Sequence, residues 1–121
     1  MYKGDITIED MVHNIEQNPQ SCVVVDVRTA NEWGKTGIAD VPCDVRTITV
    51  VSIPERELIP DFTPTLMDTV AKDKTVYFIC GSGVRSQLAA TIATQNEIPE
   101  SYNVLEGMQG WLGRSLPTKS A

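Results

Sequence analysis

Two kinds of apolar pattern alternate along the chain. Short runs at residues 22–27, 76–80 and 102–105 are almost continuously apolar and rich in β-branched or aromatic side chains. Such runs are typical of parallel strands that are buried on both faces of a sheet. Between them, apolar side chains recur every three or four residues, which is the spacing of a helix with one buried face. The predicted helices cover residues 6–18, 29–33 and 84–96, a further helix begins at residues 63–64, and a helical turn covers residues 107–112.

Local end signals support the first two helices. Thr29 stands three residues before Glu32, which is the spacing of a capping box, and Thr7 begins a weaker version of the same pattern. Because glycine breaks helical patterns, we expect Gly34 and Gly37 to end the second helix.

Residues 38–63 give the weakest pattern. Side chains over residues 47–53 alternate enough to predict a strand, but four prolines between positions 42 and 64 mark irregular connections around it. The residues from Pro117 onward are polar, and we expect them to form a loose tail. The ordered core is therefore expected to span residues 5–113.

The alternation of strands and helices predicts an α/β fold, with a mostly parallel central sheet flanked by helices on both faces. The chain has 121 residues, of which 41% are hydrophobic and 21% are charged. This size and composition are those of one domain, which we place at residues 1–121.

Charge and hydropathy exclude several classes of function. The net charge is −6 and basic residues form no cluster, so we expect no nucleic-acid partner. The longest nearly unbroken apolar run has about six residues, far fewer than a membrane span needs. The N-terminus also lacks the apolar segment of a secretory signal. We therefore expect no membrane partner and a cytoplasmic location.

The chain has three cysteines, Cys22, Cys43 and Cys80, and one histidine, His13. An odd number of cysteines without a Cys-x-x-Cys pair does not support a zinc site, and it suits free thiols in a reducing compartment. Cys22 opens an apolar run and is expected to be a small buried side chain. Cys43 lies in a predicted loop, where a role as a resolving thiol for Cys80 is a minor alternative.

Residues 75–86, T-V-Y-F-I-C-G-S-G-V-R-S, carry the candidate chemistry. Ligand sites of parallel α/β sheets lie outside the carboxyl ends of the strands, and Cys80 stands at such an end. Gly81 and Gly83 free the following loop to turn its N–H groups toward one point, which forms an anion cradle. The next helix N-terminus and the charge of Arg85 add positive potential. Because these effects depress a thiol pKa, we predict that Cys80 is a reactive nucleophile.

Asp26 is a carboxylate in an otherwise apolar run, and Arg28 follows it by two residues. Carboxylates at strand ends usually serve geometry, because a buried charge must be paired. We predict a strand-end ion pair or a cap for the next helix. The alternative is that Asp26, with Arg28, fixes a loop at the edge of the sheet and supports the Cys80 site.

Three motifs resemble, in the right order, those of the single-domain rhodanese family, the thiosulfate-sulfurtransferase-like proteins. The loop C-G-S-G-V-R-S at residues 80–86 matches the family's Cys-x-x-Gly-x-Arg-Ser form. The sequence V-V-D-V-R at residues 24–28, with Glu32-Trp33 after it, resembles the family's D-V-R and E-aromatic signature. The sequence N-V-L-E-G at residues 103–107, followed by Trp111, resembles the closing motif.

The chain departs from the family pattern in its connecting segments. The family usually has Gly-His-Ile where this chain has Thr36-Gly37-Ile38, so that histidine is missing. The closing motif usually carries two glycines, and here only Gly107 stands before Met108. Residues 42–64 do not match the usual spacing. These departures concern local structure more than the thiol.

The resemblance implies a rhodanese-like fold and sulfurtransferase activity. In that mechanism the Cys80 thiolate attacks the outer sulfur of a donor such as thiosulfate and becomes a persulfide, from which an acceptor removes the sulfur. The family mechanism implies no metal, and no cofactor beyond this covalent intermediate. The expected partners are a small anionic sulfur donor and an acceptor that is a thiol or a sulfur-carrier protein.

The same resemblance assigns the loop residues. Their backbone N–H groups are expected to stabilise the thiolate and the persulfide. Arg85 is expected to bind the anionic donor or to brace the loop against a carboxylate, for which Asp26 is a candidate. The expected substrate-binding residues are Gly81, Ser82, Gly83, Val84 and Ser86.

Two other functions stay open at this point. In rhodanese-like phosphatases and arsenate reductases the loop resembles Cys-x5-Arg, which accommodates a tetrahedral oxyanion. Here only four residues separate Cys80 from Arg85, and the shorter loop favours the smaller sulfur atom as the transferred group. The fold also serves as a non-catalytic binding or regulatory module. Inactive members typically lose the cysteine, and this chain keeps it.

Overall fold

The computed structural model describes residues 2–121 and contains a five-stranded sheet of order β1-β6-β5-β2-β4. All neighbouring strands of this sheet run parallel. The prediction of a mostly parallel α/β sheet is therefore confirmed. The strands are β1 (Gly4–Ile6), β2 (Cys22–Asp26), β4 (Asp44–Thr47), β5 (Thr75–Ile79) and β6 (Ser101–Val104).

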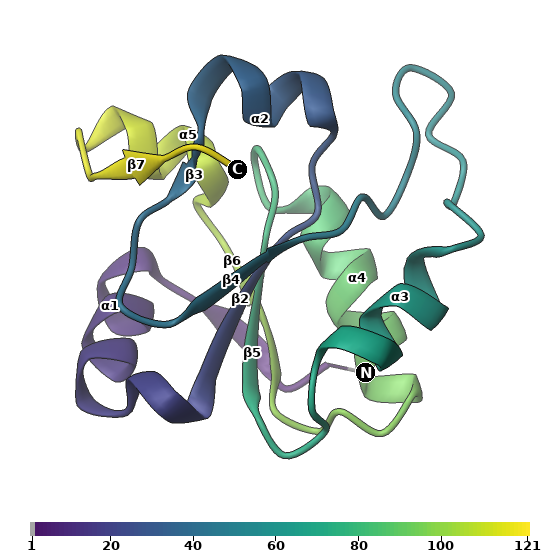
Figure 1. Cartoon of the computed structure of the whole chain (residues 1–121), viewed down its shortest axis with the longest axis horizontal. Helices are drawn as coiled ribbons and strands as arrows, with labels where there is room; N and C mark the ends of the chain where they lie inside the picture. Colours follow the sequence, from purple (N-terminus) through teal and green to yellow (C-terminus); the bar gives the residue numbers. More distant parts are fainter. Residues whose placement is uncertain (1) are drawn as a thin grey trace.

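Helices cover both faces of the sheet (Figure 1). α1 and α5 pack on one face, α3 and α4 pack on the other, and α2 lies over the carboxyl ends of the strands. No helix among residues 2–121 has the length and apolar character needed to cross a membrane. The helices are α1 (Ile8–Gln17), α2 (Ala30–Thr36), α3 (Phe62–Thr69), α4 (Val84–Gln95) and α5 (Gly107–Gly113), and Pro19–Ser21 form a short 3-10 turn.

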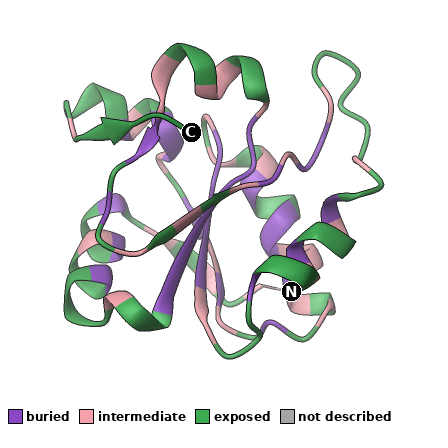
Figure 2. Ribbon diagram, in the orientation of Figure 1, coloured by how far each residue is buried: buried purple, intermediate pink, exposed green. Residues whose placement is uncertain are grey.

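The central strands are apolar throughout because each of their faces meets helices. Val23 and Val25 pack in one core cluster with Ala93 of α4, whereas Val24 packs in a second cluster with Trp111 of α5. Alternate residues of a strand point to opposite faces, so both sets of side chains are buried. Figure 2 shows this burial along the central strands, with exposed residues on the outer surfaces of the helices.

The predicted start signals of the first two helices are present. Thr7 caps α1 by accepting a hydrogen bond of 3.1 Å from a first-turn N–H group, and Thr29 and Glu32 form the capping box of α2. The expected break at Gly34 is wrong, because α2 continues to Thr36 and ends at Gly37, whose φ is 73°. A glycine inside a helix costs only about 1 kcal/mol, which does not stop a well-capped helix.

The strand predicted over residues 47–53 is also wrong in its position. The strand β4 ends at Thr47, and the chain then leaves the sheet as an irregular segment. Ile48 and Val50 are buried there, and their N–H groups donate to the carbonyl groups of Asp26 and Val27 at 3.0 and 3.2 Å. Burial of alternate side chains beside the end of β2 therefore produced the pattern of a strand.

The C-terminal residues form an ordered strand rather than the loose tail expected from Pro117 onward. The strand β7 (Thr118–Lys119) pairs antiparallel with β3 (Ile38–Ala39). The Pro117 carbonyl accepts hydrogen bonds from the N–H of Asp40 at 3.0 Å and from the indole of Trp111 at 2.8 Å. The tail makes these contacts with its backbone atoms, so its polar side chains give no sign of them. The ordered core therefore continues past residue 113.

Candidate active site

Cys80 follows the last residue of β5, the middle strand of the sheet, and is only 1% exposed. Residues 81–83 then turn the chain into α4. Gly83 has a φ of 93°, and a Cβ at this position would lie 2.7 Å from the Leu105 carbonyl oxygen. The turn therefore needs glycine at position 83 for both its backbone conformation and its space.

The loop directs hydrogen-bond donors at the Cys80 sulfur. The Gly83 N–H donates to Sγ at 3.1 Å, and the Ser86 hydroxyl lies 3.2 Å from Sγ. Burial raises the pKa of Cys80, but the Ser86 hydroxyl and the N–H groups of Ser86, Ser82 and Gly83 outweigh this effect and lower the pKa. These donors stabilise the thiolate in the way the loop sequence predicts.

The Ser86 hydroxyl is shared between two acceptors. Its oxygen also lies 2.5 Å from Oδ1 of Asn103, whose amide nitrogen donates to Asp5 at 3.0 Å. Because the amide is held in this orientation, Asn103 presents only its oxygen to Ser86. A hydroxyl has one hydrogen, so Ser86 donates either to Asn103 or to the Cys80 thiolate.

Arg85 is braced by a carboxylate of α2. Its two terminal nitrogens donate to the two carboxylate oxygens of Glu32 at 2.7 and 2.8 Å. This ion pair lowers the pKa of Glu32 to about 2 and raises the pKa of Arg85. The expectation that Asp26 is the bracing carboxylate is wrong, because the guanidinium reaches Glu32 across the loop. The guanidinium lies against Gly81, since a Cβ added at that glycine would be 3.2 Å from a terminal nitrogen of Arg85.

Asp26 and Arg28 form the predicted ion pair at the end of β2. Both are buried, and the Arg28 guanidinium donates to the two carboxylate oxygens at 3.0 and 2.8 Å. Arg28 also donates to the Thr36 hydroxyl and to the Gly37 carbonyl, both at 2.9 Å. The indole N–H of Trp33 donates to Asp26 at 3.1 Å. The pair therefore fastens α2, which carries the brace of Arg85, to the end of the strand.

The start of α5 holds the other side of the loop. The N–H groups of Met108 and Gln109 donate to the carbonyl groups of Cys80 and Gly81 at 2.7 and 3.0 Å. Gly107 has a φ of 61°, and a Cβ there would lie 2.7 Å from the Cys80 carbonyl oxygen. Since these carbonyl groups point toward α5, the loop N–H groups are free to point at the sulfur. Met108 replaces the usual second glycine without disturbing this contact, which its backbone makes.

The structure brings together the predicted loop residues but not Cys43. Ser82 is exposed and Val84 is 63% exposed, so their backbone rather than their side chains contributes to the cradle. Cys43 precedes β4, whose register places it level with Cys22 at the amino ends of the strands. Five residues of strand, about 16 Å at 3.3 Å per residue, separate that end of the sheet from Cys80. The alternative of Cys43 as a resolving thiol is therefore wrong.

Two contributing residues were not assigned from sequence. Glu32 was recognised as a capping residue and as part of the E-aromatic signature, and Asn103 as the first residue of the closing motif, but neither was assigned a role at Cys80. A signal existed for Glu32, because a loop arginine that neighbours a thiol needs a carboxylate, and Glu32 follows the strand that lies beside β5. No comparable signal identifies Asn103, since its role depends on the pairing of β6 with β1.

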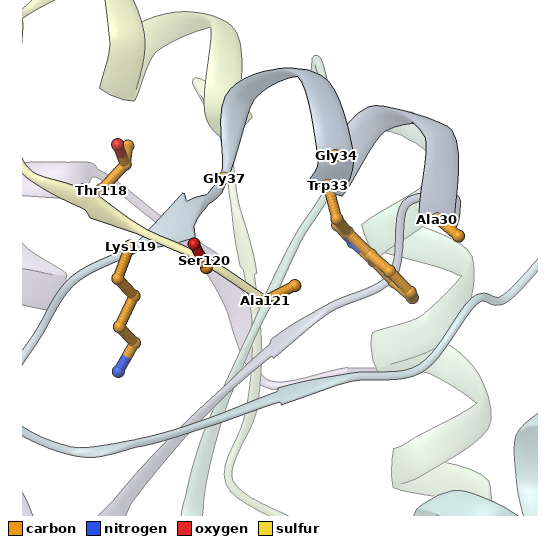
Figure 3. Close-up of a pocket in the computed structure, with 8 residues that line it drawn as sticks. All are labelled: Ala30, Trp33, Gly34, Gly37, Thr118, Lys119, Ser120 and Ala121. Carbon is orange, nitrogen blue, oxygen red and sulfur yellow. The ribbon is translucent and has the colours of Figure 1, made fainter.

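A cavity of about 670 Å³ lies beside this site. Figure 3 shows Trp33 projecting from α2 on one side and the C-terminal residues from Thr118 onward on the other. Cys80 does not line this cavity, so the sulfur does not react there. Over the part of the chain that the structure describes, no three His, Cys, Asp or Glu side chains are grouped to hold a metal ion.

Comparison with known proteins agrees with this geometry. The family model of the rhodanese-like domain matches residues 7–114. An uncharacterised protein of Rickettsia conorii is 30% identical over 103 residues, which cover 78% of this chain and 80% of that protein. The crystal structure of Rv0390 from M. tuberculosis has 30% sequence identity and a TM-score of 0.85, and the match covers 100% of both chains.

A more distant structure shows the likeness of fold alone. The solution structure of the 30 kDa polysulfide-sulfur transferase homodimer from Wolinella succinogenes has 22% identity and a TM-score of 0.74, over 96% of this chain and 77% of that one. The family model spans nearly the whole chain, and its match includes all three motifs identified in the sequence. The chain therefore belongs to the family of rhodanese-like domains.

Proposed function

We propose that the protein is a sulfurtransferase that moves a sulfane sulfur from a donor to a thiophilic acceptor through a persulfide on Cys80. The observation that carries this proposal is the set of donors around Sγ, namely the Ser86 hydroxyl and three loop N–H groups, which lower the pKa of Cys80. A thiolate at neutral pH is the species that attacks sulfur.

The proposed reaction has two displacement steps. In the first, the Cys80 thiolate attacks the outer sulfur of the donor, an S–S bond forms, and the rest of the donor leaves with the electron pair of the broken bond. In the second, the acceptor nucleophile attacks the outer sulfur of the persulfide, and Cys80 leaves as a thiolate. The donors that stabilise the resting thiolate also stabilise it as the leaving group. The proposal requires neither a metal nor a cofactor.

The substrates follow from the charge of the loop. Because Arg85 is paired with Glu32, an anionic donor would be held by the N–H groups and by the N-terminus of α4 rather than by a free guanidinium. We propose thiosulfate or a persulfide as the donor and a thiol or sulfur-carrier protein as the acceptor. The three cysteines are free, which fits the reducing conditions of the cytoplasm.

Phosphate chemistry is disfavoured by the size of the loop. Four residues separate Cys80 from Arg85, and Gly83 and Ser86 both lie within hydrogen-bond distance of the sulfur. A phosphoryl group needs a ring of donors placed around an oxyanion, farther from the sulfur than these contacts. The loop geometry therefore supports the transfer of one sulfur atom.

Mass spectrometry after incubation with thiosulfate tests the proposal. We expect the Cys80 peptide to gain the mass of one sulfur, and cyanide to remove it as thiocyanate. The Cys80→Ser variant is the control and should gain no sulfur. Hydrolysis of p-nitrophenyl phosphate without any persulfide would instead identify a phosphatase. If the protein neither gains sulfur nor hydrolyses the ester, sulfur transfer from thiosulfate is refuted.

A further inference from the structure

A pair of thiols lies at the amino ends of the strands, at the end of the sheet opposite Cys80. Cys22 is the first residue of β2, and Cys43 directly precedes β4. The parallel register pairs Val23 with Asp44, so one step earlier it places Cys22 beside Cys43. Neighbouring strands lie about 4.8 Å apart, and disulfides join residues whose Cα atoms are about 4.4–6.8 Å apart. The strand spacing therefore falls within the range that a disulfide bridges.

Both side chains point to the same face of the sheet. Cys22 belongs to the core cluster formed with α1 and α5, and Cys43 packs against the same cluster, whereas Val23, the residue after Cys22, belongs to the cluster on the opposite face. The two cysteines also line one cavity of about 500 Å³ at this edge. The two thiols therefore lie on the same face of the sheet and line the same cavity, so the sheet does not separate them.

Exposure differs between the two thiols and fixes the order in which they react. Cys22 is 5% exposed, whereas Cys43 is partly accessible to solvent. Burial, together with the neighbouring Cys22 and Asp44, raises the pKa of Cys43 to about 11, although Lys119 opposes the shift. Burial also raises the pKa of Cys22, and a hydrogen bond with Tyr77 and the charge of Lys74 oppose this only in part. With a pKa of about 11, Cys43 is about 0.01% ionised at neutral pH, so it reacts slowly.

We propose that Cys22 and Cys43 form a reversible disulfide by exchange with low-molecular-weight disulfides. The Cys43 thiolate attacks one sulfur of the small disulfide, so a mixed disulfide forms and one small thiolate leaves. Cys22 then loses its proton and attacks the Cys43 sulfur, so the protein disulfide forms and the second small thiolate leaves. Two protein thiols are oxidised, and one small disulfide is reduced to two thiols.

The disulfide fastens the edge strand β4 to its neighbour β2. It closes the loop of residues 22–43 in the unfolded chain as well, and so removes conformational freedom from that state. For a loop of about 20 residues in a domain of this size, we expect the melting temperature to rise by about 10 °C on oxidation. Cys80 lies at the carboxyl end of the middle strand, at the other end of the sheet, so the cross-link leaves the atoms of its loop in place.

The test uses the full chain carrying Cys80→Ser, so that the thiol of lowered pKa cannot react first. The protein is incubated with oxidised glutathione at mildly alkaline pH, blocked with iodoacetamide and digested with trypsin. Trypsin cuts after Arg28 and Lys35, so the two cysteines fall in different peptides. We expect these peptides to be joined within a monomer, and the melting temperature to rise by about 10 °C and to fall back after reduction.

A matched variant separates the cross-link from oxidation of single thiols. With Cys43→Ser added, a substitution at a partly exposed position, neither the joined peptides nor the rise in melting temperature should appear. Glutathione adducts without joined peptides, two alkylated thiols, or a cross-link between two molecules would each overturn the proposal. Because the test protein lacks Cys80, its outcome is independent of the proposed sulfur transfer.

Discussion

Replacing Ser86 by alanine tests how the cradle activates the sulfur. The substitution removes one oxygen from a fully buried side chain that lies 3.2 Å from Sγ and 2.5 Å from Asn103. Burial then still raises the pKa of Cys80, while the largest opposing contribution is lost. The loop N–H groups remain, so the pKa should rise without returning to that of a buried thiol with no donors.

The magnitude follows from the sharing of one hydrogen. A hydrogen bond to a charged group contributes about 1.5–3 kcal/mol. To make this bond, Ser86 gives up its bond to Asn103, which is worth about 1 kcal/mol between neutral groups. The net stabilisation of the thiolate is therefore about 0.5–2 kcal/mol, and one pKa unit corresponds to 1.36 kcal/mol. We expect the pKa of Cys80 to rise by about 1 unit in Ser86→Ala.

The assay is the rate of alkylation by iodoacetamide against pH, followed on the Cys80 peptide by mass spectrometry so that the other thiols do not contribute. Ser82→Ala is the matched control, because Ser82 is exposed and contributes only its backbone N–H group. The alkylation rate of Cys80 in Ser82→Ala should depend on pH as it does in the wild type. An unchanged or lower pKa in Ser86→Ala would refute the reasoning, and would mean that the hydroxyl donates permanently to Asn103.

Three further predictions concern the supports of the loop. The pKa of Glu32 falls from 4.5 to about 2 on folding, so its contribution to stability is complete above pH 4.5 and is lost as the pH falls toward 2. After discounting for partial exposure, Glu32→Gln should lower the free energy of unfolding by about 2 kcal/mol at pH 7, measured by urea denaturation. The stabilities of the two proteins should become equal in acid, and a difference that stays constant with pH would contradict the role of the Glu32 carboxylate. Arg28→Met leaves a buried carboxylate unpaired and should lower the free energy of unfolding by about 3–5 kcal/mol. The control Arg46→Met removes an exposed ion pair and should lower it by under about 1 kcal/mol, and equal losses in the two variants would refute the role of burial. Gly83→Ala should lower persulfide formation because its Cβ meets a carbonyl oxygen, and Gly113→Ala, which has open space, is the control; a fully active Gly83→Ala protein would contradict this account.

The fold and the reactive cysteine were predictable because their causes are local. The strands β2 and β5 are recognisable from continuous apolar runs, and the glycines and the helix after Cys80 identify its loop without any distant residue. The capping box of α2 was readable for the same reason. Each of these signals lies within about a dozen residues, the range over which periodicity and end signals act.

The choice of Glu32 as the partner of Arg85 was not predictable, because the contact joins distant segments. Arg85 and Glu32 are 53 residues apart, and either Glu32 or Asp26 satisfied the need for a carboxylate. The strand β7 is held by backbone contacts to β3, which leave no mark on side-chain polarity. The register that sets Cys22 beside Cys43 likewise depends on how β4 aligns with β2, which no local pattern specifies.

The contact between α5 and the Cys80 loop has a consequence for the chain as it is synthesised. The carbonyl groups of Cys80 and Gly81 are bound by N–H groups of residues 108 and 109, which leave the ribosome almost thirty residues after the cysteine. Until then the loop lacks its anchor, so its N–H groups are not held toward the sulfur. A nascent chain that ends before residue 108 would therefore carry Cys80 as an ordinary thiol, and its reactivity would begin only once residues 108 and 109 are in place.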